Sequence, residues 1–135
     1  MAKIDLVVRG ASWKDQASDL LVAKGKIVEC RPYDERESFE ARQVDAHDLV
    51  LLPSLIDAHV HLREPGFEYK EDIASGLGAA AHGGFGAVMC MANTDPVNDD
   101  ATVTEMMLAK AKAHWPKGPR LHPVGAATKK LAGEE

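Results

Sequence analysis

The first 48 residues show the spacing of apolar positions that is typical of β-strands with one covered face. The apolar residues Ile4, Leu6 and Val8 are each separated by a single position, which matches the two-residue period of a strand. Two further apolar runs, at 19–23 and 26–30, are separated by only two residues. The pattern predicts three strands, the last two of them forming a hairpin.

The turn of this hairpin is predicted at Lys24-Gly25, because glycine adopts the positive φ of a tight turn without steric cost. Residues 31–45 are mostly polar and predict a connection of low regularity. We therefore expect residues 1–52 to form the N-terminal part of a small β domain.

The pattern changes after residue 48. Residues 49–53 and 55–60 are nearly continuous apolar runs, which are typical of strands buried on both faces of a parallel sheet. Further strands are predicted over 87–91 and 121–126.

Two helices are predicted between these strands. The first begins near Asp72 and ends at Gly83, and the second begins near Asp100 and ends before Pro116; acidic residues at the start and Gly or Pro at the end are the usual helix boundaries. The order β, α, β, α, β predicts an α/β fold class with a parallel sheet for residues 53–135.

Composition narrows the class of protein. Sixteen basic and twenty-one acidic residues give a net charge of −5, and without a basic cluster we expect no nucleic-acid partner. No apolar window reaches the length of a membrane span and the N-terminus does not resemble a signal peptide, so we expect a cytoplasmic protein without membrane contact. Cys30 and Cys90 are predicted to be buried free thiols, with a disulfide or a metal role as the alternative.

Two histidines at the end of the 55–60 strand are the first candidates for chemistry. His59 and His61 are two residues apart, so their imidazoles should leave the same face and could bind one divalent metal ion. Simple side-by-side packing of two rings is the alternative. Asp57, one strand period earlier, is expected on the same face, either orienting a ligand or accepting backbone N–H bonds.

An arginine and an asparagine follow two of the predicted strands. Arg63 can hold a carboxylate through two parallel hydrogen bonds and therefore indicates an anionic ligand; a protein carboxylate such as Glu64 is the alternative partner. Asn93 follows the 87–91 strand and could both donate to and accept from a substrate. It lies in a segment rich in turn formers, so a purely structural turn role stays open.

These residues lie in segments that resemble bacterial dihydroorotases of the amidohydrolase superfamily. The sharpest similarity is Asp-Ala-His-Val-His-Leu-Arg-Glu-Pro at 57–65, together with Asn93-Thr94. Residues 1–48 contribute only a generic β pattern. The similar segments as a whole are 53–66, 68–73, 79–85 and 90–96.

The resemblance implies a zinc-dependent hydrolase on a TIM (β/α)8 barrel, with about three barrel strands in this chain, preceded by strands of a small β-sandwich domain. Such enzymes interconvert N-carbamoyl-L-aspartate and L-dihydroorotate in de novo pyrimidine biosynthesis. By resemblance, His59 and His61 are metal ligands for Zn²⁺, and His61, Arg63 and Asn93 bind the small-molecule substrate. A homo-oligomer is expected for the full-length enzyme.

Other parts of the family pattern are absent or altered. The bridging metal ligand, two later zinc histidines and the general base are expected beyond Glu135, so no catalytic base is expected within the chain and the chain alone is expected to be inactive. Ser54, Gly86 and Ala92 stand where the family usually has Gly, Thr and Pro, and Ala92 could loosen the loop that carries Asn93. The alternatives are an allantoinase or dihydropyrimidinase-like hydrolase, or a non-catalytic truncated amidohydrolase-like module.

Overall fold

The computed structural model describes residues 3–134. The chain divides into two compact units, Met1–Pro53 and Ser54–Glu135. Each unit contains one β-sheet. None of the helices in the described part of the chain is long and apolar enough to cross a membrane.

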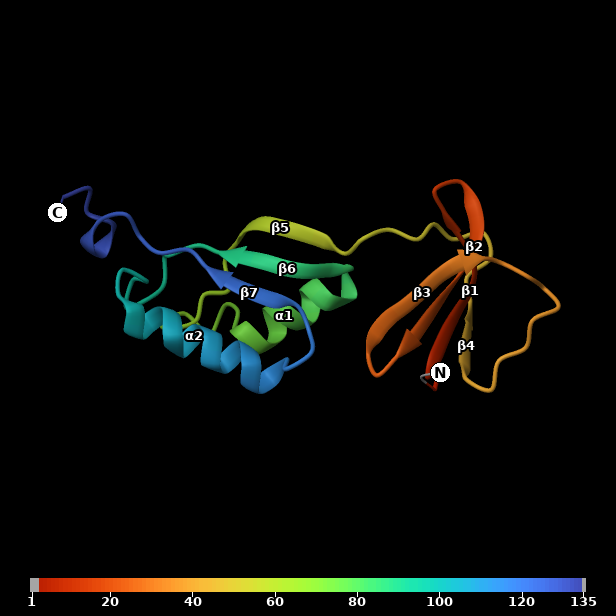
Figure 1. The fold of residues 1–135 in the computed structure, drawn as a ribbon. Helices are drawn as coiled ribbons and strands as arrows, with labels where there is room; N and C mark the ends of the chain where they lie inside the picture. The colour runs from red at the N-terminus through yellow and green to blue at the C-terminus, as the bar shows by residue number, and fades with distance from the viewer. Residues whose placement is uncertain (1–2, 135) are drawn as a thin grey trace. The chain divides into compact units, whose positions relative to one another are not determined.

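The first unit is a four-stranded sheet in the order β3-β2-β1-β4 (Figure 1). Strands β1, β2 and β3 are antiparallel neighbours, and β4 is parallel to β1. The hairpin turn predicted at Lys24-Gly25 is confirmed, since both residues have positive φ angles, of 51° and 72°. The strands are β1 (Leu6–Trp13), β2 (Gln16–Ala23), β3 (Lys26–Pro32) and β4 (Arg42–Asp45).

Three predictions for this unit were wrong. Strand β4 lies inside the stretch predicted to be irregular, because residues 42–45 pair with β1 despite their polar character. Residues 49–53 are not a buried strand: only Val50 forms a bridge, to Ser12, and its side chain is 68% exposed. Cys30 is exposed rather than buried, and it is a free thiol. The described residues of this unit form one sheet, and the β-sandwich stays a prediction.

A buried arginine orders the connection between β3 and β4. The Arg9 guanidinium lies 3.1 Å from the fully buried carboxylate of Asp19 and donates to the carbonyl oxygens of Asp34 and Glu37 at 2.8 and 2.9 Å. It also stacks against the ring of Tyr33. This polar network explains why a segment with little apolar character has a defined course.

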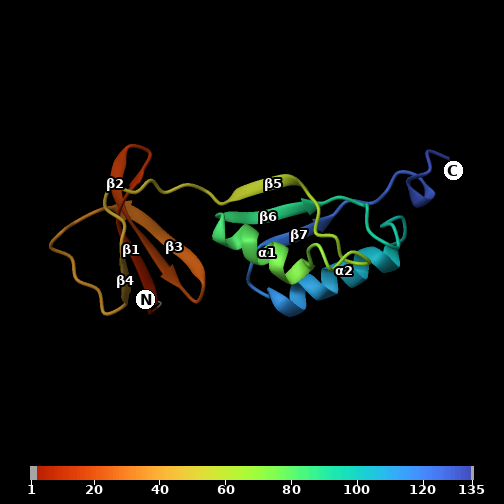
Figure 2. The same cartoon turned by 180° about the vertical axis from the view of Figure 1, so that it is seen from behind.

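The second unit has the predicted order β, α, β, α, β. Its three parallel strands lie in the order β5-β6-β7, and both helices cover the same face of the sheet (Figures 1 and 2). The elements are β5 (Leu55–Val60), α1 (Ile73–His82), β6 (Phe85–Cys90), α2 (Ala101–His114), β7 (Arg120–Pro123) and a 3-10 turn η1 (Lys129–Leu131).

Both helices begin where the acidic residues predicted. Asp72 caps α1 by accepting the backbone N–H of Ser75 at 2.7 Å, and the Ser75 hydroxyl completes a capping box. Asp100 caps α2 by accepting from the backbone N–H of Thr102. These bonds satisfy N–H groups that the first turn of a helix leaves without partners, and they place each helix directly after a strand-end loop.

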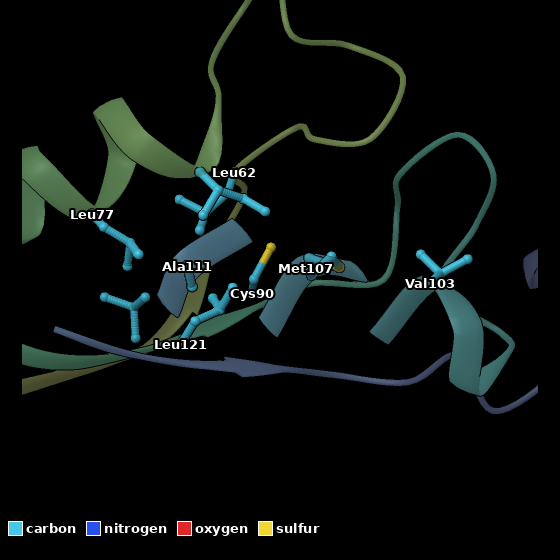
Figure 3. Packing of buried hydrophobic residues seen from close by; sticks show 9 residues of the cluster. Leu62, Leu77, Cys90, Val103, Met107, Ala111 and Leu121 are labelled. Atoms are coloured by element: carbon cyan, nitrogen blue, oxygen red, sulfur yellow. The ribbon is translucent and has the colours of Figure 1, made fainter. Parts of the chain in front are cut away.

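The core of this unit lies between the sheet and the two helices. Leu77, Cys90 and Met107 are fully buried there, and Figure 3 shows side chains from helices and strands converging on this layer. Residues 55–60 were predicted to be buried on both faces, but Ile56 is 68% exposed, because within the described residues only one face of the sheet is covered. The cluster is Leu62, Ile73, Leu77, Val88, Cys90, Val103, Met107, Ala111 and Leu121.

Candidate active site

The candidate site lies at the carboxyl ends of β5 and β6, and a bulge in β5 sets its geometry. Asp57 is in register with Val88, and Val60 is in register with Cys90. Three steps along β5 therefore match two steps along β6, so β5 contains one additional residue. The bulge lies between Asp57 and Val60 and so includes His59, and it changes the face on which the residues on either side of it lie.

The bulge corrects the prediction for Asp57. Because Asp57 and Val60 pair with residues two apart on β6, they lie on one face with the buried Val88. Asp57 is thus not placed one strand period from His59 on a common face. Its carboxylate accepts the backbone N–H of His59 at 3.0 Å, which is the structural role that the sequence left open.

The two histidines are brought together as predicted. The ring centroids of His59 and His61 are 5.2 Å apart with an interplanar angle of 69°, and both residues are exposed. Two imidazoles that bind one zinc ion at about 2.1 Å in a tetrahedral arrangement have ring centres roughly 5 Å apart. Ordinary edge-to-face packing gives similar distances, so the spacing permits a shared metal ion but does not require one.

Asn93 lies beside this pair. Its side-chain oxygen Oδ1 is 2.8 Å from Nδ1 of His61, although 32 residues separate the two in sequence. The asparagine therefore does more than form a turn, because it links the loop after β6 to the imidazole at the end of β5.

The loops after β5 and β6 are also joined through their backbones. The N–H of Asp95 donates to the carbonyl oxygen of Pro65 at 2.9 Å. Gly66, with a φ of +97°, packs so closely that a Cβ there would lie 2.9 Å from the carbonyl carbon of Asp95. Only glycine fits this approach, and the contact fixes the two loops relative to each other.

Arg63 lies in the first of these loops with a φ of +63°, a left-handed conformation that costs a non-glycine residue about 1–2 kcal/mol. Its carbonyl oxygen accepts the N–H of Phe67 at 3.0 Å. No ion pair involves its guanidinium among residues 3–134. Burial raises the pKa of the Cys90 thiol, and the Arg63 charge acts in the opposite direction.

The alternative partner for Arg63 is otherwise engaged. The Glu64 carboxylate, whose side chain is 7% exposed, pairs with Lys110 of α2 and accepts the backbone N–H of Ile73 at 2.9 Å. The hydrogen bond from Lys110 to Glu64 raises the pKa of Lys110. Glu64 thus ties the Arg63 loop to both helices, a positioning role that the sequence analysis missed.

Asn98 is a second residue that the sequence analysis missed. It is almost fully buried; its amide donates to the Val124 carbonyl at 2.9 Å, and its Oδ1 accepts the Thr104 hydroxyl at 2.7 Å. Its backbone N–H bonds the Ala92 carbonyl at 3.0 Å. These bonds hold the Asn93 loop between α2 and the end of β7. The loop therefore has a defined conformation although residue 92 is alanine, which was expected to loosen it.

The histidine pair fits part of a metal site. Neutral imidazoles are good ligands for zinc, and the bond from His61 Nδ1 to Asn93 leaves Nε2 of His61 available. Within residues 3–134, no group of three or more His, Cys, Asp or Glu side chains could hold an ion together. The histidine pair alone thus falls short of the three or four protein ligands that a tight zinc site needs.

Ser54 and Gly86, two of the three positions at which the sequence departs from the family pattern, lie next to each other in the structure. A Cβ added to Gly86 would lie 2.8 Å from Cβ of Ser54 and closer still to its hydroxyl. The side chain of Ser54, directly before β5, therefore takes the space that a side chain at position 86 of β6 would fill. The absence of a side chain at Gly86 is matched to the presence of one at Ser54.

The fold has counterparts among solved structures. An L-hydantoinase (dihydropyrimidinase) from Arthrobacter aurescens matches 93% of this chain and 28% of its own, with a TM-score of 0.70 and 18% identity. A prolidase complexed with N-methylphosphonate-L-proline matches 90% of this chain with a TM-score of 0.54. At this level of identity the likeness concerns the fold: a mixed α/β arrangement like part of the hydantoinase.

Sequence comparison narrows the class further. Residues 48–119 match the family model described as dihydro-orotase-like, and the chain belongs to this family. It is 47% identical over 120 residues to a dihydroorotase of Syntrophotalea carbinolica and 48% identical to one of Geobacter metallireducens. A dihydroorotase of Anaeromyxobacter sp. (strain K) is 46% identical over 129 residues. The chain spans 27–29% of the length of these relatives.

Proposed function

We propose that this chain supplies the first part of the active site of a dihydroorotase, an enzyme that interconverts N-carbamoyl-L-aspartate and L-dihydroorotate in pyrimidine biosynthesis. The observation that carries the proposal is the cluster of His59, His61 and Asn93 at adjacent strand ends, in a chain 47% identical to a protein of that name. Polar groups at the carboxyl ends of parallel strands form the active sites of barrel enzymes.

In this proposal His59 and His61 hold Zn²⁺ together with ligands from outside the chain. The metal ion, when bound, supplies Lewis acidity toward the amide carbonyl and activates water. Arg63 and Asn93 bind the carboxylate of the substrate, which keeps the cyclic amide beside the histidine pair. Because the Glu64 carboxylate is paired with Lys110, it does not occupy the Arg63 guanidinium, which can donate hydrogen bonds to an anionic ligand.

The rest of the barrel, the β-sandwich, the homo-oligomer and the cytoplasmic location belong to the same proposal. The general base is assigned to a residue outside this chain, so the isolated 135 residues should not turn over substrate. Two imidazoles also fall short of a tight zinc site, so zinc should be lost from the isolated chain on dialysis.

A chimera tests the proposal. This chain is joined to the remaining residues of the Syntrophotalea carbinolica dihydroorotase and assayed with L-dihydroorotate, in parallel with the isolated chain and a His59→Ala chimera. We expect metal-dependent hydrolysis by the chimera alone. A folded chimera that is inactive, or that hydrolyses allantoin or a dihydropyrimidine in preference, would overturn the assignment.

A further inference from the structure

The hydrogen bond between His61 and Asn93 determines which ring nitrogen carries the proton. An amide oxygen can only accept a hydrogen bond, and Asn93 Oδ1 lies 2.8 Å from Nδ1 of His61. Nδ1 must therefore be the protonated nitrogen of the neutral ring, which leaves the lone pair on Nε2. Either nitrogen of a neutral imidazole can carry the proton, so a partner that fixes it on Nδ1 decides which nitrogen can bind a metal.

The same bond leaves the other half of the Asn93 amide without a partner. Its Nδ2 group carries two N–H donors, and none of them has a bond within residues 3–134. Because these are donors only, the ligand group that lies against Asn93 must present acceptors, as a carboxylate does. Arg63, two residues after His61, also carries only donors on its side chain.

Resting on the proposed function, we propose that Asn93 is a positioning residue that serves both halves of the site. Its carbonyl oxygen holds His61 in the tautomer whose Nε2 can bind zinc, while its amide nitrogen stays available for the anionic group that the proposed function already assigns to Asn93. In a metal-bound histidine, one ring nitrogen binds the metal and the other is hydrogen-bonded to a partner. That partner orients the ring and increases the basicity of the metal-binding nitrogen. One side chain thereby couples the metal site to the anion site.

The surrounding structure keeps the Asn93 amide in place for this purpose. The carbonyl oxygen of Ala92 accepts the N–H groups of both Thr94 and Asn98, at 2.9 and 3.0 Å. The Thr94 hydroxyl donates to the Pro96 carbonyl at 2.8 Å. Because hydrogen bonds hold the backbone on both sides of residue 93, the Cα position of Asn93 is fixed. Forming the bond to His61 therefore costs the Asn93 side chain little further conformational entropy.

Two substitutions separate the two roles. Asn93→Asp keeps an acceptor for His61 but has no N–H donors and adds a negative charge. Asn93→Ala removes both groups. The tautomer of each histidine is read from long-range proton–nitrogen NMR spectra of the ¹⁵N-histidine-labelled 135-residue chain, in alkaline buffer without metal. His59 has no bond to Asn93 and serves as the internal control.

We expect His61 to be protonated on Nδ1 in the wild-type chain and in Asn93→Asp, and to lose this preference in Asn93→Ala, with His59 unchanged throughout. In Zn²⁺ titrations followed at the two histidines, Asn93→Ala should weaken binding by roughly 10- to 100-fold, as is usual when such a partner is lost. Asn93→Asp should restore it. Shifts of the wild-type spectrum on addition of L-dihydroorotate should be absent from both variants.

An unchanged His61 tautomer in Asn93→Ala would overturn the inference, and so would full Zn²⁺ affinity in that variant. Retention of L-dihydroorotate binding by Asn93→Asp would overturn the part that concerns the anion. None of these measurements requires turnover. Failure of the chimera to hydrolyse substrate would therefore count against the proposed function while leaving the tautomer result intact.

Discussion

The helix-covered face of the β5-β6-β7 sheet and the loops at its carboxyl end arise from the same strands but are stabilised differently. The covered face buries Leu77, Cys90 and Met107 completely, and its stability comes from the removal of apolar surface from water. The exposed His59 lies at the end of β5 and the exposed His61 in the loop that follows it. Besides the buried apolar Leu62, the loops are held by the buried polar side chains of Glu64 and Asn98.

The residues that stabilise the fold are therefore different from the residues of the candidate site. Removing a side chain from the covered face should strongly destabilise the unit, and removing one from the exposed site should leave the stability nearly unchanged. Glu64 and Asn98 lie between these extremes, because they are buried but make only polar bonds. The following substitutions test the contrast, beginning with the largest expected effect.

Adjacent residues of α2 provide the sharpest test of the covered face. Met107 is completely buried and Leu108 is 42% exposed. Met107→Ala should lower the free energy of unfolding by about 2–5 kcal/mol, through lost burial and the cavity left behind. Leu108→Ala should lower it by less than about 1 kcal/mol. Urea unfolding of both variants measures the difference, and equal losses would contradict the assigned core.

The Ser54–Gly86 pair tests packing at the start of the sheet. Gly86→Thr should cost about 1–3 kcal/mol because its side chain would overlap that of Ser54. Adding Ser54→Gly should recover most of this loss, since the space is then free and threonine suits a strand. A double-mutant cycle by urea unfolding gives the coupling energy. Strictly additive effects would show that the two positions are independent.

Glu64 tests the polar support of the strand-end loops. Glu64→Gln should cost about 1–2 kcal/mol, because the bond from Ile73 weakens and Lys110 loses its partner. The cost stays below that of a fully buried ion pair, since the Lys110 side chain is 44% exposed. Glu68→Gln, at an exposed position of the same loop, is the control in urea unfolding. A cost for Glu68→Gln as large as that for Glu64→Gln would refute the support role.

The cap of α1 predicts a dependence on acid. The bond from the Ser75 backbone lowers the pKa of Asp72 below its usual 3.8, so the folded chain binds this proton less readily than the unfolded chain. The stabilisation is therefore present above about pH 4 and is lost as the pH falls through the lowered pKa. Asp72→Asn keeps an acceptor without the charge. Its stability relative to the wild type should rise between pH 5 and pH 2 in thermal unfolding; a constant difference would contradict the titration.

The smallest effect on stability is expected at the site itself. His61→Ala should change the free energy of unfolding by no more than about 0.5 kcal/mol, because the ring is exposed and its partner Asn93 stays accessible to water. Thermal unfolding checks this directly, with His82→Ala as a control at another exposed position. A large loss of stability would mean that the histidine pair holds the loops together.

Much of the secondary structure, and the proximity of the two histidines, could be predicted from the sequence. The helix boundaries at Asp72 and Asp100, the hairpin at Lys24-Gly25 and the alternation of strands and helices along the second unit follow from local rules about caps, turns and apolar periodicity. The predicted proximity of His59 and His61 also follows from their spacing and is confirmed. Their role as zinc ligands stays a prediction.

Only the tertiary structure decided which face Asp57 lies on, what Glu64 binds and how Asn93 reaches His61. A bulge in β5 reverses the faces on which its residues lie, and a regular two-residue period cannot foresee it. The partners of Glu64 are nine and 46 residues away, and Asn93 is 32 residues from His61. Local preferences therefore determined the elements of this chain, whereas contacts between residues distant in sequence determined how the candidate site is assembled.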